Sequence, residues 1–334
     1  MRISPDQISV VIQGPVMGGS EIPQQQRYTY RAVESVRRIL PGAQVILSTW
    51  QGSDTSNLNV DELVTSADPG PYVLKNPEYP DYLNNVNRQI TSTLAGLRAT
   101  TREFAIKLRS DCELLHDGLL NHWEEFPHRS GHLKVFSSRI VCGELFTRDP
   151  RIISYLFHPA DIFQFGKTED LVRFWDVPPA PAEETLHWRE KIPTKLLGGA
   201  EGLEVRYVPE QYIWIAALRK AGHEFALGQC CETPRGLIAA SELSILNNFC
   251  IVDERSLGVV FPSGFLRHGV WKTYSRQEWQ RLYELYCVRG DKDEIAARVE
   301  LVSKWASIRR RRWMLDRIFF GLDRLMFGNA SYLA

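Results

Sequence analysis

Two carboxylates at the end of an apolar segment are the residues of this sequence best suited to chemistry. Residues 104–109 read FAIKLR and alternate like a β-strand, and Asp111 and Glu113 follow directly. If the backbone stays extended there, residues two apart point the same way, so both carboxylates face one spot. Such oxygens hold Mg²⁺ or Mn²⁺ beside a nucleotide. We therefore predict a divalent-cation site at Asp111 and Glu113, with Arg109 as a fixed charge beside it. A solvated strand end is the alternative.

Three further acids are candidates for a general base, namely Glu210, Asp161 and Asp170, the last paired in sequence with Glu169. Glu210 is favoured because it opens a predicted helix, where a carboxylate can project into a cleft. An ordinary acid in the first turn of a helix is the alternative. Of the histidines in loop-like contexts, His158 precedes a proline, and His268 could supply a third metal ligand.

The motifs of several familiar enzyme classes are missing. No GxGxxG follows the first predicted strand, which argues against a dinucleotide-binding fold of that kind. The sequence contains neither HExxH nor GxSxG. Gly166-Lys167-Thr168 looks like the end of a phosphate-binding loop, but Asp161 stands where that loop needs its first glycine. The Gly-rich, Arg-bearing loop of sugar nucleotidyltransferases is also absent after the first strand.

The bulk composition is that of an ordinary folded enzyme. The 334 residues include 40 Lys and Arg and 40 Asp and Glu, so charge gives no reason to expect a nucleic-acid partner. No apolar run approaches the ~20 residues of a membrane span. The N-terminus lacks the zones of a secretory signal, and the six cysteines show no metal-ligand spacing. We expect reduced thiols and a cytoplasmic location.

The first third of the chain alternates between strands and helices. Predicted strands cover residues 8–13, 44–50, 62–66 and 104–109, and predicted helices cover residues 25–40 and 84–99. This order favours an α/β fold with a largely parallel sheet, whose ligands sit at the carboxyl ends of the strands. Gln13, Gly14, Pro15, Asp68 and the carboxylates after residue 109 all fall at that edge.

The rest of the chain is less regular. Strands are predicted at residues 132–142, 162–165, 205–208 and 224–229, and helices at residues 168–175, 209–221, 235–247 and 275–327, the last broken near Gly290. An α/β half with an acid-x-acid site after its fourth strand is the layout of a GT-A glycosyltransferase fold, here with a helical C-terminal tail. We divide it into a domain of residues 1–270, with a nucleotide-binding half to about 115 and an acceptor half to 270, and an extension of residues 271–334.

A set of short motifs, in order over about two thirds of the chain, resembles the WavE lipopolysaccharide-synthesis proteins. The motifs are Val10-Val-Ile-Gln-Gly-Pro15, Leu47-Ser-Thr-Trp50, Asp68-Pro-Gly70, Asn84-Asn-Val-Asn-Arg-Gln89, Lys107-Leu-Arg-Ser-Asp111, Phe157-His-Pro-Ala-Asp161 with Phe165-Gly166, and Glu210-Gln-Tyr-Ile-Trp214. The resemblance implies a bacterial glycosyltransferase-like protein that builds a surface polysaccharide at the cytosolic face of the inner membrane. Asp-Cys-Glu departs from the Asp-x-Asp expected of a metal site.

In this interpretation each candidate residue has a role toward a nucleotide-sugar donor. Residues 13–15 would cradle base and ribose, Asp68 would accept hydrogen bonds from them, and Arg88 would meet the diphosphate. The acceptor would be a lipid-linked glycan of lipopolysaccharide, O-antigen or capsule. A non-catalytic assembly protein with this fold and a sugar nucleotidyltransferase are the alternatives. The basic, aromatic segment of residues 303–327 predicts contact with the membrane surface, or packing on the catalytic domain or a second subunit.

Overall fold

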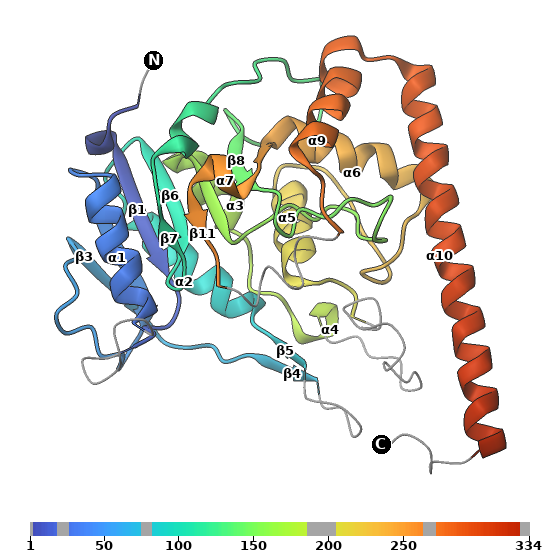
Figure 1. The fold of residues 1–334 in the computed structure, drawn as a ribbon, viewed down its shortest axis with the longest axis horizontal. Helices are drawn as coiled ribbons and strands as arrows, with labels where there is room; N and C mark the ends of the chain where they lie inside the picture. The colour runs from blue at the N-terminus through green and yellow to red at the C-terminus, as the bar shows by residue number, and fades with distance from the viewer. Residues whose placement is uncertain (1–2, 19–26, 75–81, 186–204, 263–271, 328–334) are drawn as a thin grey trace.

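A computed structural model describes residues 3–18, 27–74, 82–185, 205–262 and 272–327, with backbone alone for residues 312–327. Figure 1 shows a sheet at the centre, helices around it and one long helix, α10, along one side. The strands are β1 (Ile8–Gln13), β2 (Gln44–Trp50), β3 (Glu62–Ser66), β4 (Tyr72–Leu74), β5 (Tyr82–Asn84), β6 (Phe104–Arg109), β7 (Glu113–Leu114), β8 (Ile140–Gly143), β9 (Phe163–Lys167), β10 (Phe249–Val252) and β11 (Val259–Val260).

The helices are α1 (Tyr28–Ile39), α2 (Val86–Arg98), α3 (Thr168–Trp175), α4 (Ala182–Thr185), α5 (Pro209–Lys220), α6 (Arg235–Asn248), α7 (Glu254–Leu257), α9 (Arg276–Tyr283) and α10 (Lys292–Phe327). Shorter turns are the 3-10 helices η1 (Pro5–Gln7) and η3 (Gly118–His122), and the π-helix η7 (Glu284–Arg289). Gly290 ends η7 with a positive φ and separates α9 from α10, which confirms the predicted break.

The central sheet has seven strands in the order β10-β8-β9-β6-β1-β2-β3. The pairs among β6, β1, β2 and β3 are parallel, as is β10 with β8, whereas β9 is antiparallel to both of its neighbours. The predicted α/β class with a helical C-terminal region is confirmed. The sheet is largely parallel, as predicted, and β9 is its antiparallel strand. Because β9 runs backwards, the residues just before it lie at the carboxyl edge of β6.

The helices of the first half lie close against the sheet. β1 is buried along its whole length, which fits its β-branched composition. α2 presents Val86, Ile90 and Leu97 to the core. At Gly96 an added Cβ would lie 2.4 Å from Val11 Cγ1, so only glycine allows α2 to approach β1 this closely. This contact fixes the N-terminus of α2 near the strand ends.

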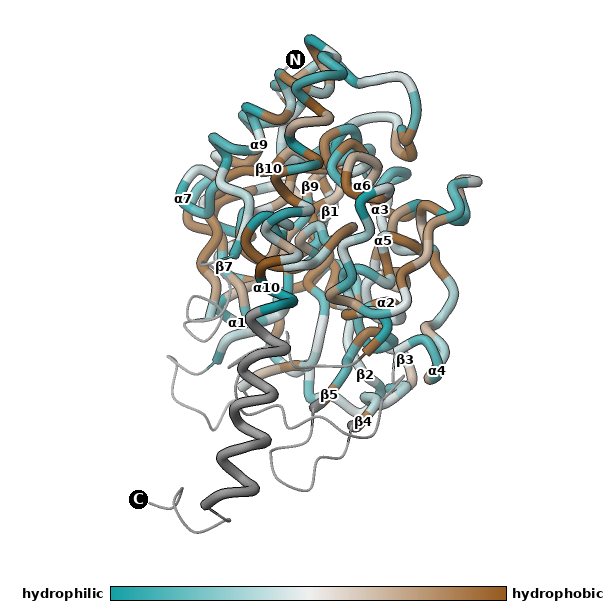
Figure 2. The backbone as a smooth tube through the Cα atoms, turned by 90° about the vertical axis from the view of Figure 1, so that its right-hand side faces the viewer, coloured by the Kyte–Doolittle hydropathy of each residue, from teal (hydrophilic) through white to brown (hydrophobic). Residues whose placement is uncertain are grey.

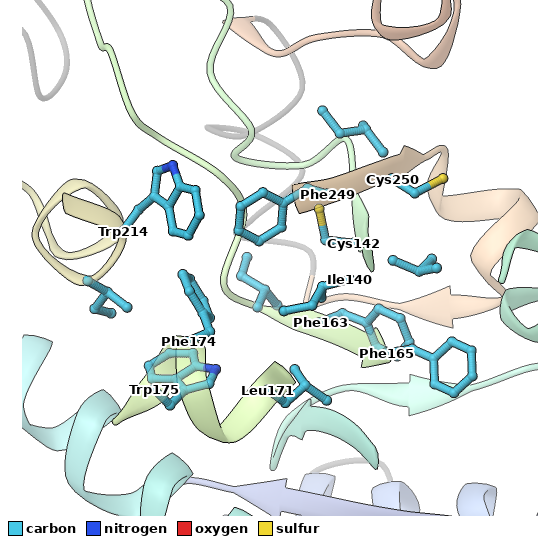
Figure 3. Close-up of a cluster of buried hydrophobic side chains, with 14 of the residues drawn as sticks. Ile140, Cys142, Phe163, Phe165, Leu171, Phe174, Trp175, Trp214, Phe249 and Cys250 are labelled. Carbon is cyan, nitrogen blue, oxygen red and sulfur yellow. The ribbon is translucent and has the colours of Figure 1, made fainter. Parts of the chain in front are cut away.

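One hydrophobic cluster runs through the molecule from Ile3 to Val302, so both predicted halves share a core. In Figure 2 hydrophobic segments gather along the inner strands and helices. Its aromatic centre joins α3, α5 and β10, where Trp214 packs edge-on against Phe249 with ring centroids 5.0 Å apart and lies beside Phe174 (Figure 3). α5 is therefore an interior helix, held firmly by the core. The predicted boundary near residue 270 lies outside the described residues.

Two predicted strands do not form. Residues 205–208 and 224–229 are irregular in the structure. Val205 and Val208 instead pack with Ile153, Tyr155 and Cys230 in a small separate cluster. The apolar side chains of Val205 and Val208 are therefore buried in this cluster, and they do not form a strand of the sheet. Within the described ranges, none of the helices has the length and apolar character that crossing a membrane requires.

Candidate active site

The ends of β1, β2 and β6 are tied together at the carboxyl edge of the sheet. Gly14 follows β1 with φ 129° and donates its N–H to the Ser48 carbonyl at 3.1 Å. Ser110, which follows β6, donates its N–H to the Gln13 carbonyl and its hydroxyl to the Pro15 carbonyl at 2.8 Å. A Cβ on Gly14 would lie 2.8 Å from Ser110 Oγ. The predicted nucleotide loop, residues 13–15, is thus a tight, preformed turn.

The side chain of Gln13 points to the helix behind the loop. Its Nε2 donates to Ser92 Oγ of α2 at 2.7 Å, and the residue is buried. Gln13 therefore positions the loop against α2. Gly14 is buried, and Pro15 is the exposed residue of the loop that a ligand can reach.

Asp68 and Arg88, predicted separately as contacts to the nucleotide, bind each other. Arg88 donates from Nε to Asp68 Oδ1 at 2.7 Å and from its second terminal nitrogen to Oδ2 at 2.5 Å. The guanidinium lowers the pKa of Asp68, and the carboxylate raises the pKa of Arg88. Both side chains remain about one third exposed, at 34% and 33%. The pair brings together the end of β3 and the first turn of α2, at the edge where both were expected.

The acid-x-acid segment does not stay extended. The Cys112 N–H donates to the Arg109 carbonyl at 3.0 Å, so the chain turns at Ser110 and Asp111. Arg109 holds Asp111 in a two-pronged contact of 2.9 and 2.8 Å. Burial disfavours the Arg109 charge, but the Asp111 carboxylate outweighs it and raises the pKa of Arg109.

Glu113 contacts a different cation. It pairs with Arg31 of α1 at 2.5 Å, after the turn has separated it from Asp111. The expectation of two convergent carboxylates is therefore wrong, because each has its own arginine. In the described part of the chain, no group of three or more His, Cys, Asp or Glu side chains is placed to hold a metal ion. Asp111 and Glu113 are each engaged by an arginine, so in this arrangement neither carboxylate is presented alone to a divalent cation. His268, the predicted third ligand, lies outside the described residues.

Asp161 lies at the same edge, immediately before β9. Its neighbour in space is Lys107 of β6, whose Nζ donates to the Asp161 carbonyl and lies 3.4 Å from the Ile162 carbonyl. Both residues are buried, and within the part of the chain that the structure describes Asp161 Oδ2 has no hydrogen-bond partner. The Lys107 ammonium also sits over the Trp175 ring, 5.1 Å from its centre. A buried carboxylate oxygen left unpartnered is costly to maintain and therefore points to function.

Glu210 opens α5 and reaches the same place. Gln211 beside it is fully buried and donates to the Leu156 and Cys230 carbonyls at 2.8 and 2.9 Å, which fixes the start of the helix. The Glu210 carboxylate lies 3.5 Å from His158 Nε2 and stays 15% exposed, against 3% for the His158 side chain. Glu210 is thus held by the core and still open to solvent.

The electrostatics of these residues show that they form one cluster. Burial raises the pKa of Asp161, and the charge of Glu210 raises it further, against the effect of Lys107. Burial also raises the pKa of Glu210, against Arg148 and Lys107. Burial lowers the pKa of Lys107 to about 8. Two carboxyls with raised pKa values beside buried cations make this cluster a candidate for a site of proton exchange.

His158 is a neutral member of this cluster. Burial and the nearby Arg148 guanidinium lower its pKa to about 3. Its ring stacks on Tyr155 with centroids 5.4 Å apart, and the Arg148 N–H donates to its carbonyl at 3.1 Å. A neutral imidazole of fixed orientation can position the Glu210 carboxylate without competing for its proton.

Asp170 does not belong to the site. The register pairs Lys167 with Phe104, so α3 begins at the opposite edge of the sheet. The Asp170 carboxylate is fully buried and accepts hydrogen bonds from the Ser137 N–H and hydroxyl, both at 2.7 Å, and from the Ser138 N–H at 3.0 Å. Asp170 stabilises the loop before β8, and its candidacy as a base is wrong.

The sequence analysis missed Lys107 and Arg148. A signal for Lys107 was present, because a lysine within an otherwise apolar strand next to the centre of a sheet must be buried and must have partners. Arg148 follows an irregular segment, and its sequence neighbours carry no comparable signal.

Comparison with solved structures gave a similarity to a cytidylyltransferase from Leptospira borgpetersenii serovar Hardjo-bovis (strain JB197). It has 11% sequence identity and a TM-score of 0.27, and it covers 53% of this chain and 67% of that chain. A similarity at this level carries no conclusion about the present chain. The comparison with curated proteins gave no match.

Comparison with protein families gave a clear result. The family described as WavE lipopolysaccharide synthesis matches residues 8–313. The match includes the strand ends, Asp161, Glu210 and the first part of α10, and so extends well past the motifs recognised in the sequence. The chain belongs to the WavE lipopolysaccharide synthesis family.

Proposed function

We propose that the protein is a glycosyltransferase of the GT-A type, which moves a sugar from a nucleotide-sugar donor to a lipid-linked glycan of the bacterial surface. The observation that carries the proposal is the pair of carboxyls with raised pKa values, the buried Asp161 and the partly exposed Glu210, near the carboxyl edge of the sheet. Family membership supports a role in lipopolysaccharide synthesis and a transferase in the broad sense.

In the proposed reaction Glu210 is the general base. The acceptor hydroxyl oxygen attacks the anomeric carbon of the donor sugar, and its proton passes to the Glu210 carboxylate. The bond from that carbon to the phosphate oxygen breaks, and the nucleoside diphosphate leaves with the electron pair. The raised pKa of Glu210 suits a base that must accept a proton near neutral pH. Greater exposure favours Glu210 over Asp161 for direct contact with an acceptor.

Cations at this edge would stabilise the leaving diphosphate. Arg109 and Arg88 are the nearest candidates on β6 and α2, and both now hold carboxylates. An incoming diphosphate would exchange with those carboxylates for the same guanidinium groups, which recognise phosphate and carboxylate in similar geometry. No step requires Asp111 and Glu113 to bind a metal.

Donor hydrolysis tests the proposal directly. Nucleotide sugars are first screened for thermal stabilisation of the full chain, with and without Mn²⁺, because a ligand that binds only the folded state raises its melting temperature. The stabilising donor is then incubated with the protein. A glycosyltransferase should release the sugar slowly to water, and Glu210→Gln should stop the release. A binding protein would leave the donor intact, and a nucleotidyltransferase would instead make nucleotide sugar from a nucleoside triphosphate and a sugar phosphate.

A further inference from the structure

One face of α10 is fixed to the body of the protein by a buried ion-pair network. Arg298 donates to Glu242 of α6 at 2.7 Å and to Glu278 of α9 at 2.9 Å, and the side chains of Arg298 and Glu242 are almost completely buried. One turn later Val302 is fully buried. Further along, Arg309 donates to the Pro150 carbonyl at 2.7 Å and to the Arg151 carbonyl. The backbone of α10 therefore has a set orientation, and Arg309 contacts protein.

The neighbouring face of the same helix is apolar and exposed. Leu301, Trp305 and Ile308 are 42%, 47% and 43% exposed, respectively. Their spacing of four and three residues places them in one row on the helix surface. A tryptophan in such a row is suited to the boundary between water and lipid, where its ring is apolar and its N–H stays solvated. We call these three residues the α10 row.

Positive charge lies along one flank of the α10 row, where helical spacing places Lys304 and Arg311, whereas Arg310 falls on the opposite side of the helix. Lys304, Arg310 and Arg311 are exposed in the structure. In the sequence, residues 301–315 contain one lysine and four arginines and no acid, although the whole chain has a formal net charge of zero. The preceding acid, Glu300, is paired with Arg235 at 2.9 Å. Figure 2 shows hydrophobic and hydrophilic residues mixed along the described part of α10.

We propose that the α10 row, with the basic residues beside it, docks on an anionic lipid surface. The helix would lie in the plane of the headgroups, with Leu301, Trp305 and Ile308 in the interface and the cations on lipid phosphates. A second copy of the chain fits less well, because a two-fold contact through this face would bring two acid-free basic segments together. In Figure 1 both α10 and β1 run from the top toward the bottom of the view. The C-terminal end of α10 therefore lies on the same side of the molecule as the carboxyl edge of the sheet.

Vesicle sedimentation of the full chain tests the proposal and needs neither donor nor acceptor, so its result is separate from that for the proposed function. The wild type should bind vesicles of phosphatidylethanolamine and phosphatidylglycerol, should bind phosphatidylcholine vesicles far less, and should be released by high salt. The double change Lys304→Glu and Arg311→Glu, at the two basic residues beside the row, should lower the affinity by roughly thirtyfold or more.

The apolar part of the surface has its own variant and control. Leu301→Ser, Trp305→Ser and Ile308→Ser together should lower vesicle affinity by about tenfold or more. The matched control is Leu63→Ser with Leu83→Ser, two comparably exposed leucines on β3 and β5, and it should bind vesicles like the wild type. All variants concern exposed side chains, and their melting temperatures should stay close to that of the wild type.

Three outcomes would overturn the proposal. If the wild-type chain shows no preference for phosphatidylglycerol vesicles, the partner of the α10 row is not an anionic lipid surface. Vesicle binding that survives both the charge-reversal variant and the serine variant of the α10 row would place the lipid contact elsewhere. A fall in oligomer mass in sedimentation equilibrium on changing the α10 row, with vesicle binding intact, would assign the row to a second copy of the chain. Release of the wild-type chain from anionic vesicles by high salt requires no substitution, so this measurement decides the proposal even if a variant folds poorly.

Discussion

His158 Nε2 lies 3.5 Å from the Glu210 carboxylate, and its ring is held by stacking on Tyr155. With the pKa of His158 lowered to about 3, this imidazole stays neutral throughout the physiological range. It can therefore orient the Glu210 carboxylate while leaving its charge intact, which a protonated neighbour would neutralise. In the proposed reaction the relationship separates two roles: Glu210 would exchange the proton, and His158 would position the group that does so.

Substitution of the proposed base should affect turnover far more than donor binding. We expect Glu210→Gln to lower turnover by about 10²–10⁴-fold, because the amide keeps the shape but cannot accept the acceptor proton. Donor affinity, measured by thermal shift, should stay within about threefold, since the base acts on the acceptor in the transition state.

The control for this prediction is Glu169→Gln, which changes an exposed acid at the far edge of the sheet. It should leave both quantities near wild type. Near-normal turnover in Glu210→Gln would instead move the role of base to Asp161, or indicate a mechanism that needs none.

The pH dependence of stability should reveal Asp161. Burial and the charge of Glu210 raise the pKa of Asp161, so the folded state binds this proton more tightly than the unfolded chain does. The free energy of unfolding should therefore fall as the pH rises from about 4, the ordinary aspartate value, through the folded pKa. Asp161→Asn removes that loss. We expect it to melt higher than the wild type at pH 7, by roughly 2–4 °C for each kcal/mol recovered.

Thermal unfolding of both proteins between pH 4 and pH 8 is the measurement, with the difference shrinking toward the acid end. His158 contributes in the opposite sense in the acid part of this range, because its lowered pKa lets the unfolded chain bind a proton there that the folded protein does not. It is present in both proteins, so its effect largely cancels in the difference. If Asp161→Asn is instead less stable than the wild type at pH 7, the attraction between the Asp161 charge and Lys107 outweighs the cost of burying the Asp161 carboxylate.

The sequence was most informative where local pattern and tertiary structure agree. Residues 8–13 and 44–50 are apolar runs that could only be interior strands, and both boundaries are confirmed. Residues 132–142 were predicted as one strand, but only Ile140–Gly143 pairs. The segment before it is held by side chains distant in sequence, such as Asn248 Oδ1 accepting from the Val135 N–H at 2.8 Å. No local pattern encodes such contacts.

The site shows the same division. Asp161 and Glu210 were identifiable as acids at the start of β9 and α5, and the structure brings them into one cluster. That Asp111 and Glu113 would separate depended on a turn at Ser110 that the alternating pattern did not reveal. Their arginine partners come from β6 and from α1, 82 residues away in the case of Arg31 and Glu113. Long-range pairing of this kind is decided by the packed fold, and charge content alone does not predict it.

Breaking the pair of Asp68 and Arg88 should cost donor affinity more than stability. Both side chains are about one third exposed, so Asp68→Asn should change the free energy of unfolding by less than about 1 kcal/mol. If the donor diphosphate takes Arg88 and the freed Asp68 carboxylate accepts hydrogen bonds from the base or ribose, donor affinity should fall by about tenfold in this variant and in Arg88→Gln. Thermal shift with the stabilising donor measures both. The control is Asp176→Asn, which weakens the exposed pairs that Asp176 forms with Arg98 and Lys220. Equal affinities in all three variants would exclude the pair from the nucleotide site.

The buried network on α10 predicts a large stability effect without a catalytic one. Arg298→Met would leave Glu242 buried without its cation, so we expect a loss of about 3–5 kcal/mol in the free energy of unfolding, measured by denaturant titration. Arg235→Met, which removes the exposed pair with Glu300, is the control and should cost less than about 1 kcal/mol. An Arg298→Met variant as stable as the control would show that α10 is not held by this network.

The turn at Gly14 yields the sharpest structural prediction. Its φ of 129° disfavours any other residue, and an added Cβ would lie 2.8 Å from Ser110 Oγ. Gly14→Ala should therefore destabilise the protein by about 2 kcal/mol or more and weaken donor binding, because the loop must shift. Ser110→Ala removes the clashing hydroxyl, so the double variant should recover part of the loss but not the part due to φ. Denaturant unfolding of the two single variants and the double variant measures this coupling. Strictly additive losses would show that the close approach of Gly14 to Ser110 does not constrain the loop.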